Sequence, residues 1–260
     1  MSKIRISKRK SYREYIRSLI TLSNKFRVDI RKVFDKFKKR FARDFENIQD
    51  VDNDTVQSFY DELYETTERN MLSIFDHMDK SIKRTRGIKQ TDLTDLIPAL
   101  QLYITEIVGQ HIIQVTQTTK DKVKKEIELG INAGLEIKTI AENIAKNNAF
   151  SLWRSTMIAR TETHGAMMYA KSEFTKNLGF QRPIKVWVTS QDDRVRSWHS
   201  AMNGTVVKGN EDFKVLTPIK GGGFAELPMA YPSDDRGGAS NVVNCRCHYE
   251  FIDEDDILVD

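Results

Sequence analysis

The chain has 260 residues, of which 39% are hydrophobic and 30% are charged, and its formal net charge is +4. This length allows one or two domains with a hydrophobic core, and no apolar run approaches the ~20 residues that a membrane-spanning helix requires. The basic N-terminus is not followed by an apolar segment, so we expect no secretory signal. Two cysteines separated by one residue cannot form a disulfide framework, and we therefore expect a reducing compartment with free or metal-bound thiols.

The small net charge conceals a strong asymmetry along the chain. Residues 1–43 contain 16 Lys and Arg against three acids, a charge of +13, and the remaining residues have a charge of −9. Such a basic segment can neutralise phosphates or bind an acidic protein surface. The alternative is a solvated helix face that pairs with the acidic helix after it. The candidate contacts with nucleic acid or an acidic partner are Lys8, Arg9, Lys10, Lys38, Lys39 and Arg40.

Three long amphipathic helices are predicted in the first half of the chain. Apolar residues recur at every third or fourth position of the first, with Lys and Arg between them. Asn53 offers an N-cap for the second, and Pro98 is tolerated in the first turn of the third. The predicted ranges are 12–45, from 53 to a break at Gly87, and from 91–95 to about 129.

Two shorter helices are predicted next, over 136–146 and from an N-cap at Ser151 to about residue 178. The apolar stripes of the long helices are too narrow for a large core of their own. We therefore expect an elongated hairpin or bundle that packs on partners.

The pattern changes at Phe180, after which strand-like alternation begins. Strands are predicted over 184–189, 204–207, 213–216 and 248–252, and residues 217–240 are predicted to form a long irregular loop. The predicted fold class is α+β, with long N-terminal helices followed by a small loop-rich α+β module. The predicted domains are a helical arm over 1–148, the module over 149–252 and an acidic tail over 253–260.

Cys245 and Cys247 carry the clearest chemical signal. On an extended strand both side chains would project from one face, so both sulfurs could bind one ion. Structural zinc favours four N or S ligands in a tetrahedron, and the two further ligands could be His199 and His164. His248 is the weaker choice, because adjacent residues of a strand point to opposite faces. The alternatives are two buried thiols without a metal and a redox-active pair.

Arg160 lies within a predicted helix and could tie that helix to the C-terminal module. We expect its partner to be a carboxylate, Asp192 or Asp193, because bidentate pairs of this kind are common structural contacts. The same carboxylates could instead orient His199 as a general base. We favour the structural interpretation, because neither a nucleophile nor a phosphate-binding glycine loop accompanies these residues.

The order of these motifs is more informative than any one of them. The segments are Ala159–Thr163, Trp187, Asp193–Arg196, His199 and Asn244–Cys247, and the residues that carry the pattern are Arg160, Glu162, Trp187, Asp193, Arg194, Arg196, Asn244 and Arg246. This combination resembles the phage Mu F-like family of minor head proteins, or phage head morphogenesis proteins, over about residues 150–252.

The resemblance implies a structural minor head protein of a tailed bacteriophage and does not imply a settled enzymatic activity. We expect no enzyme, because the sequence has no recognisable catalytic signature. It implies action in capsid assembly and portal association, and in DNA packaging or delivery. The implied partners are the portal or major capsid protein and packaged double-stranded DNA, with no membrane. The implied location is inside the capsid near the portal, after assembly in the host cytoplasm. The alternative function is a metal-dependent hydrolase or a transferase toxin carried in the virion.

Overall fold

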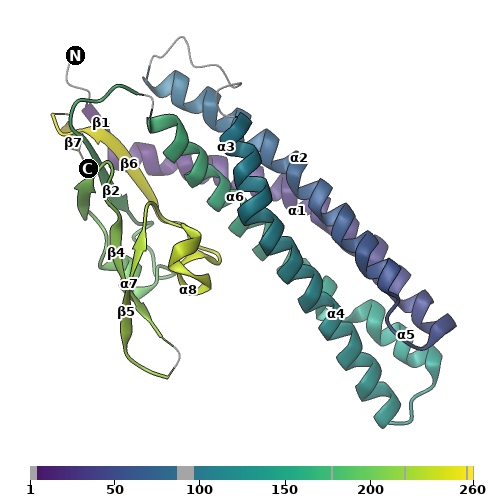
Figure 1. The fold of residues 1–260 in the computed structure, drawn as a ribbon. Helices are drawn as coiled ribbons and strands as arrows, with labels where there is room; N and C mark the ends of the chain where they lie inside the picture. Colours follow the sequence, from purple (N-terminus) through teal and green to yellow (C-terminus); the bar gives the residue numbers. More distant parts are fainter. Residues whose placement is uncertain (1–4, 87–96, 177, 220, 256, 260) are drawn as a thin grey trace. The chain divides into compact units, whose positions relative to one another are not determined.

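The computed structural model describes residues 5–86, 97–176, 178–219, 221–255 and 257–259 (Figure 1). Within these ranges, no helix combines the length and the apolar character needed to cross a membrane. The helical elements of the first two thirds are α1 (Lys8–Ile48), α2 (Asn53–Arg86), α3 (Ile97–Leu102), the π-helical η2 (Tyr103–Val108), α4 (Gly109–Asn132), α5 (Ile137–Lys146), η3 (Asn148–Phe150) and α6 (Leu152–Lys176).

Short strands and helical turns make up most of the rest. They are β1 (Arg5–Ser7), β2 (Pro183–Val188), α7 (Ser197–Ser200), β3 (Val206–Lys208), β4 (Phe213–Pro218), β5 (Phe224–Met229), η4 (Asp235–Gly237), α8 (Ala239–Val242), β6 (His248–Asp253) and β7 (Ile257–Val259). The predicted α+β class is therefore confirmed.

The predicted helices are confirmed in kind, and their ends differ by a few residues. The second helix begins at Asn53 as predicted, but its cap is Asp52, whose carboxylate accepts from Thr55 N at 3.0 Å. Ser151 caps α6 as predicted, because its Oγ accepts from Arg154 N at 3.2 Å. The predicted break at Gly87 and the predicted start at 91–95 lie outside the described residues.

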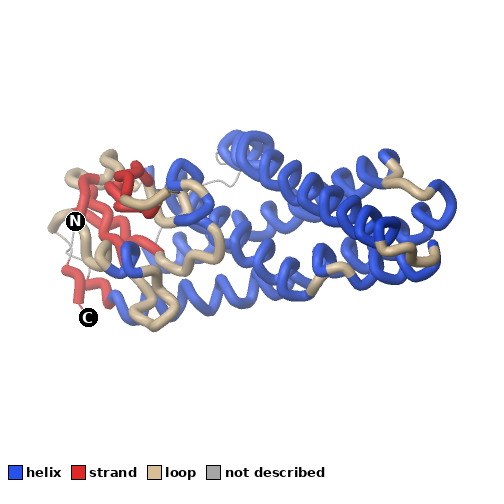
Figure 2. The backbone as a smooth tube through the Cα atoms, turned by 90° about the horizontal axis from the view of Figure 1, so that it is seen from below, coloured by secondary structure: helices blue, strands red, loops and turns tan. Residues whose placement is uncertain are grey.

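The chain forms two compact units, each assembled from separate segments. The strand unit comprises Met1–Leu22, Ile74–Leu100 and Arg160–Asp260, and the helical unit comprises Ser23–Ser73 and Gln101–Ala159. Every strand of the described residues belongs to the strand unit (Figure 2). The predicted domain boundary at 148/149 does not coincide with a boundary between these units.

Aromatic side chains form the centre of the helical unit. Phe34, Phe37 and Phe41 recur along one face of α1 and are at most 3% exposed. They meet Phe59 of α2 and Phe150 of η3, with ring centroids 5.3 to 6.2 Å apart. Aromatic pairs at such distances contribute about 0.5–1.5 kcal/mol beyond the burial of their surface. The helical periodicity in the sequence therefore becomes a packed core.

Antiparallel pairing around β2 forms the main sheet of the strand unit, in the order β3-β2-β6 (Figure 1). The register places Trp187 opposite Tyr249 and Val188 opposite His248. The side chains of Trp187, Tyr249 and His248 are at most 1% exposed. β6 therefore holds the residues that follow Cys247 in the interior of this unit.

The predicted loop over 217–240 is wrong in part. It contains the end of β4, the whole of β5, η4 and α8, and β4 pairs with β5 as an antiparallel hairpin. Gly221–Gly223, between the two strands, have φ values of +101°, +98° and +87°, a region that glycine enters without steric cost. A further parallel pair, β1 with β7, was not predicted either.

Candidate functional site

Three buried ligand side chains meet in the strand unit. His199 lies on α7, and Cys245 and Cys247 lie in the turn between α8 and β6. The Nδ1 atom of His199 is 3.7 Å from the Cys245 sulfur and 3.6 Å from the Cys247 sulfur. The three residues are 1%, 1% and 2% exposed, and both thiols are free. We call them the His/Cys group, and they are the described residues that could hold a metal ion.

The route by which the two sulfurs converge differs from the prediction. Cys245 and Cys247 precede β6 and are not on a strand. The backbone turns at Asn244, whose φ is +57°, a left-handed value that asparagine tolerates better than most residues. His248 is the first residue of β6, and its Nε2 bonds to Glu250 Oε1 at 3.0 Å. His248 is therefore not a member of the group, in agreement with its predicted weakness as a ligand.

Asn241 of α8 fixes the orientation of His199. Its Oδ1 accepts from His199 Nε2 and from the Trp198 indole nitrogen, each at 2.9 Å. Its Nδ2 donates to Thr217 Oγ1 at 2.7 Å and to the Gly237 carbonyl at 2.8 Å. Because an indole only donates and a carbonyl only accepts, the amide has one consistent orientation. His199 then carries a proton on Nε2, and in the neutral ring its Nδ1 presents a lone pair to the two sulfurs.

His164 supports the group without being part of it. Its Nε2 donates to the backbone carbonyl of Cys247 at 2.7 Å. Burial lowers the pKa of His164, which favours its neutral form. The structure thus brings three of the four predicted metal ligands together and places the fourth, His164, behind Cys247.

The predicted partner of Arg160 is wrong. Arg160 Nη1 donates to Asn244 Oδ1 at 3.0 Å. Asp192 binds Arg246 instead, through two contacts of 2.6 and 2.7 Å. Arg160 had more than one candidate partner in the sequence, and the left-handed turn at Asn244 determines which one it meets. Asp193 is exposed, and the acceptor of the His199 ring is Asn241 rather than a carboxylate.

The two thiols influence one another. A hydrogen bond from Cys247 lowers the pKa of Cys245 well below its usual value, and His199 acts in the same direction, against the effect of burial. The pKa of Cys247 is raised well above its usual value, first by this hydrogen bond and then by burial. The pair therefore favours one thiolate, on Cys245.

The remaining motif residues differ in their relation to the group. Trp187 is fully buried on β2, and its ring centroid is 5.6 Å from that of His199 in an edge-on arrangement. Glu162 is 6% exposed on α6, and Arg194 is exposed. Arg196 donates to the carbonyl of Val243, in the turn that carries the cysteines. Most of the motif therefore holds the turn in place.

A buried polar network that the sequence did not reveal joins α1 to β6. Glu250 is 4% exposed and interacts with His248, with Ser11 and, at 3.5 Å, with Lys171 Nζ. Although burial raises the pKa of Glu250, Lys171 and His248 together lower it below its usual value. Tyr15 stacks on His248 with the ring centroids 5.0 Å apart. The start of the basic helix is therefore anchored inside the strand unit.

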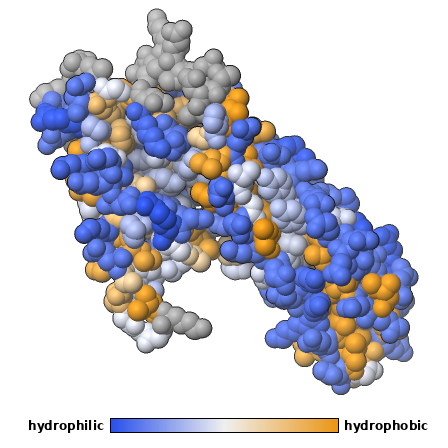
Figure 3. All heavy atoms as spheres, in the orientation of Figure 1, coloured by the Kyte–Doolittle hydropathy of each residue, from blue (hydrophilic) through white to orange (hydrophobic). Residues whose placement is uncertain are grey.

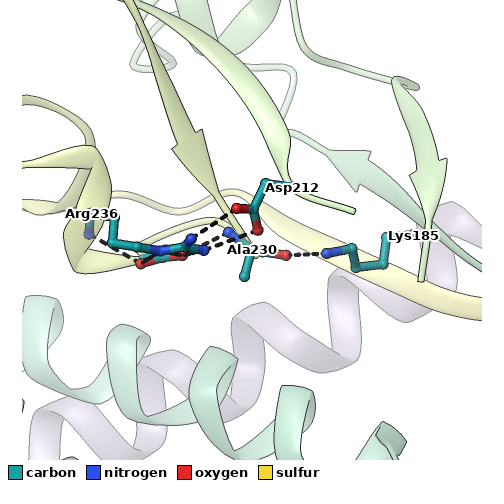
Figure 4. Close-up of polar contacts among 5 residues, drawn as sticks. Lys185, Asp212, Ala230 and Arg236 are labelled. Carbon is teal, nitrogen blue, oxygen red and sulfur yellow. Dashed lines mark hydrogen bonds and ion pairs between the residues drawn. The ribbon is translucent and has the colours of Figure 1, made fainter. Parts of the chain in front are cut away.

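A cavity of about 540 Å³ also lies in the strand unit. Figure 4 shows Lys185, whose Nζ donates to the Ala230 carbonyl at 2.8 Å, and Arg236, which binds Asp212 at 2.8 and 3.0 Å and Asp234 at 2.6 Å. Because Arg236 holds both carboxylates, neither is free to act as a general base. The cavity is lined by residues outside the His/Cys group; they include Tyr169, Phe180, Tyr231, Tyr249 and Phe251.

The predicted basic contacts are partly neutralised. Lys38 Nζ lies 2.6 Å from Asp35, and Arg40 Nε lies 3.7 Å from Asp44, so both pair with acids of α1 itself rather than with the acidic helix after it. Lys39 and Lys10 are exposed. The side chains of Lys8 and Arg9 lie outside the described residues.

Comparison with known proteins identifies one family and one relative that this chain resembles. The family model described as Phage Mu protein F like protein matches residues 121–250, which is half of the chain. The Minor head protein GP7 of Bacillus phage SPP1 is 23% identical over 244 residues, which cover 88% of this chain and 70% of that protein. No solved structure gives a significant match. The family match begins within α4 and ends within β6, so it includes the His/Cys group and parts of both units.

Proposed function

Because the chain belongs to the phage Mu F-like family of minor head proteins, we propose that it is built into the head of a tailed bacteriophage and binds portal or capsid subunits there. The observation that carries this proposal is the family match over residues 121–250. The same membership favours a structural role over the metal-dependent hydrolase or toxin considered as the alternative. An active site must admit its substrate, and the His/Cys group is at most 2% exposed.

An exposed apolar surface in the helical unit suits contact with a neighbouring subunit. Leu129 and Ile131 at the end of α4, with Leu135 and Ile137 at the start of α5, are 56%, 58%, 40% and 40% exposed. Figure 3 shows apolar residues gathered over this part of the chain. Contiguous exposed apolar side chains commonly mark protein interaction sites. We call these four residues the α4–α5 patch and propose that it contacts a portal or capsid subunit.

Contact with packaged DNA forms a second part of the proposal. Arg13 and Arg17 of α1 are exposed, and within the described residues neither makes an ion pair. Free guanidinium groups four residues apart lie on one face of a helix and suit phosphate contacts. Of the many basic residues in the N-terminal segment, Arg13 and Arg17 are therefore the ones that we propose for contact with DNA.

The proposal is tested with Leu129→Gln/Ile131→Gln, which replaces the two most exposed of the four apolar side chains of the patch. We expect the variant to fold normally and to be depleted several-fold from purified heads, measured by quantitative mass spectrometry against the major capsid protein. The matched control is Leu72→Gln, an apolar residue of α2 that is 51% exposed and outside the patch. Equal incorporation of all three proteins would rule out the patch as the contact.

A further inference from the structure

We propose that His199, Cys245 and Cys247 hold a structural Zn²⁺ ion that fastens α7 to the turn before β6. This inference goes beyond the role in head assembly and does not depend on it. The observations that carry it are the spacing of the three ligand atoms, the fixed tautomer of His199, and a set of buried polar atoms around the sulfurs that lack hydrogen-bond partners.

The spacing of the ligand atoms fits tetrahedral zinc. Typical Zn–S and Zn–N bonds of about 2.3 and 2.0–2.1 Å, at a tetrahedral angle, place the nitrogen about 3.6 Å from each sulfur. The observed Nδ1 to Sγ distances are 3.7 Å for Cys245 and 3.6 Å for Cys247. All three ligand atoms lie within 4.8 Å of one another, so a zinc ion fits between them.

Asn241 orients His199 to bind a metal. Asn241 Oδ1 accepts the Nε2 proton at 2.9 Å, which leaves the Nδ1 lone pair directed at the sulfurs. A metal-bound histidine usually donates its other N–H to an oxygen acceptor in this way. Asn241 is fully buried and is itself held by Thr217 and Gly237, so the imidazole is fixed before any metal arrives.

Unpartnered polar atoms gather around the same sulfurs. In the part of the chain that the structure describes, the Tyr15 hydroxyl and His164 Nδ1 are buried without a hydrogen-bond partner, and both side chains interact electrostatically with Cys245. Trp187 Nε1 is buried too, and it lowers the pKa of Cys247 as a hydrogen-bond donor. Zinc-bound thiolates would accept from Tyr15 and Trp187, since a thiolate is a stronger acceptor than a thiol.

Three protein ligands leave the fourth position of the tetrahedron to a water molecule. His164 donates through Nε2 to the Cys247 carbonyl, so its buried Nδ1 carries a lone pair. That lone pair could accept a hydrogen bond from such a water molecule. Three ligands and a water also occur in catalytic sites. Here the group is buried, and the cavity of the strand unit is lined by other residues, so the ion would stabilise the fold rather than react with a substrate.

A structural ion also fits the construction of this region. α7 and α8 have four residues each, and β3 has three. Such short elements bury little surface of their own, and small modules commonly rely on a metal or disulfide. Zinc would replace the thiol protons, which pass to solvent, and would link residue 199 with residues 245 and 247.

The experiment measures metal in the full chain, produced in zinc-supplemented medium and purified without chelator. We expect about one zinc per wild-type chain by plasma mass spectrometry, and loss of that zinc in Cys245→Ser and in Cys247→Ser. Replacement by Co²⁺ should give thiolate-to-cobalt absorption in the wild type and in neither cysteine variant. The matched control is His248→Gln, which alters a buried residue next to Cys247 outside the His/Cys group and should keep the metal.

A second measurement decides the question if the cysteine variants do not fold. Treating the wild type with a strong chelator should lower its Tm and make both thiols react faster with a thiol reagent. A folded wild type that contains no zinc, or another metal in its place, would refute the proposal. Full zinc content in Cys245→Ser would refute it as well. Either result would leave the role in head assembly untouched, because that role rests on family membership and the α4–α5 patch.

Discussion

Arg154 and Arg236 show two ways in which this chain stabilises a guanidinium. Arg154 of the helical unit is 6% exposed and donates to Thr119 Oγ1 and to the carbonyls of Ala149 and Val115 at 2.7 to 3.0 Å. Burial lowers its pKa to about 10, so it remains charged at neutral pH. Arg236 of the strand unit is half exposed and binds carboxylates instead. Arg154 holds backbone carbonyls in place. Arg236 pairs with carboxylates that titrate, so its contribution to the stability of the fold depends on pH.

The first prediction concerns Asp212. Its hydrogen bond with Arg236 lowers the pKa of Asp212 below its usual value. A lowered carboxyl pKa stabilises the folded state above about pH 4, and that stabilisation is lost as pH falls through the folded pKa. Because the two side chains are 34% and 50% exposed, we expect less than about 1 kcal/mol.

Thermal unfolding of wild type and Asp212→Asn between pH 3 and pH 7 tests this prediction. The difference in Tm should be largest near neutral pH and should shrink below pH 4. Glu46→Gln, which changes an exposed acid of α1, controls for the loss of one negative charge. A Tm difference that persists unchanged at pH 3 would contradict the assignment to this ion pair.

Residue types and spacing located the His/Cys group but could not reveal its supports. Cys245, Cys247 and His199 are chemically distinctive wherever they fall in a sequence. Asn241 is not, because its role depends on a turn that places it against a ring 42 positions away in the chain. The predicted partner of Arg160 was wrong for a related reason. The sequence offers several possible acceptors, and the backbone geometry at Asn244 decides which of them Arg160 meets.

At the scale of elements, Gly130 sets how closely α4 and α5 approach. A Cβ at this position would lie 2.5 Å from Ile140 Cγ1, which is too close for two carbon atoms that are not bonded to one another. For Gly130→Ala we expect overpacking to cost about 1–3 kcal/mol against a gain of about 1 kcal/mol in helix propensity. The net result is a loss of up to about 2 kcal/mol in the free energy of unfolding.

Urea denaturation measures this effect, and the double variant Gly130→Ala/Ile140→Ala should be more stable than the sum of the single effects predicts. Gly109→Ala is the matched control, because its Cβ would meet its nearest neighbour at an ordinary 3.6 Å. That substitution should be neutral or stabilising. Additive behaviour of the pair at 130 and 140 would contradict the proposed clash.

Helices were easier to predict than strands for a physical reason. The face of α1 that carries Phe34, Phe37 and Phe41 is buried, so burial imposes a helical period on the sequence. β5 pairs with β4 in a two-stranded hairpin, Met229 is the one buried residue of β5, and β5 contains Pro228. Neither apolar alternation nor residue preference therefore marks β5 as a strand.

For the molecule as a whole, the charge asymmetry yields a prediction about DNA. Neutralising the exposed Arg13 and Arg17 with Gln should weaken DNA binding and reduce the slope of log affinity against log salt by about two. Fluorescence anisotropy with duplex DNA at several salt concentrations measures both quantities. Lys32→Gln is the matched control, because Lys32 is paired with Asp29 at 3.2 Å.

An unchanged salt slope in the double variant would remove these two arginines from any DNA contact. Deleting residues 1–45 is not a usable test, because α1 supplies Tyr15 to the core of the strand unit and Phe34 to that of the helical unit. Such a deletion would unfold the chain and would affect every activity at once.

The pairing of β1 with β7 bears on the order in which the protein can fold during its synthesis. Arg5 pairs with Ile257, so the first strand has no partner until about 250 further residues have been added. The last segment of the helical unit ends at Ala159. Chains stalled on the ribosome shortly after that residue emerges should therefore already protect the helical unit from proteolysis, whereas the strand unit becomes protected only near the end of translation.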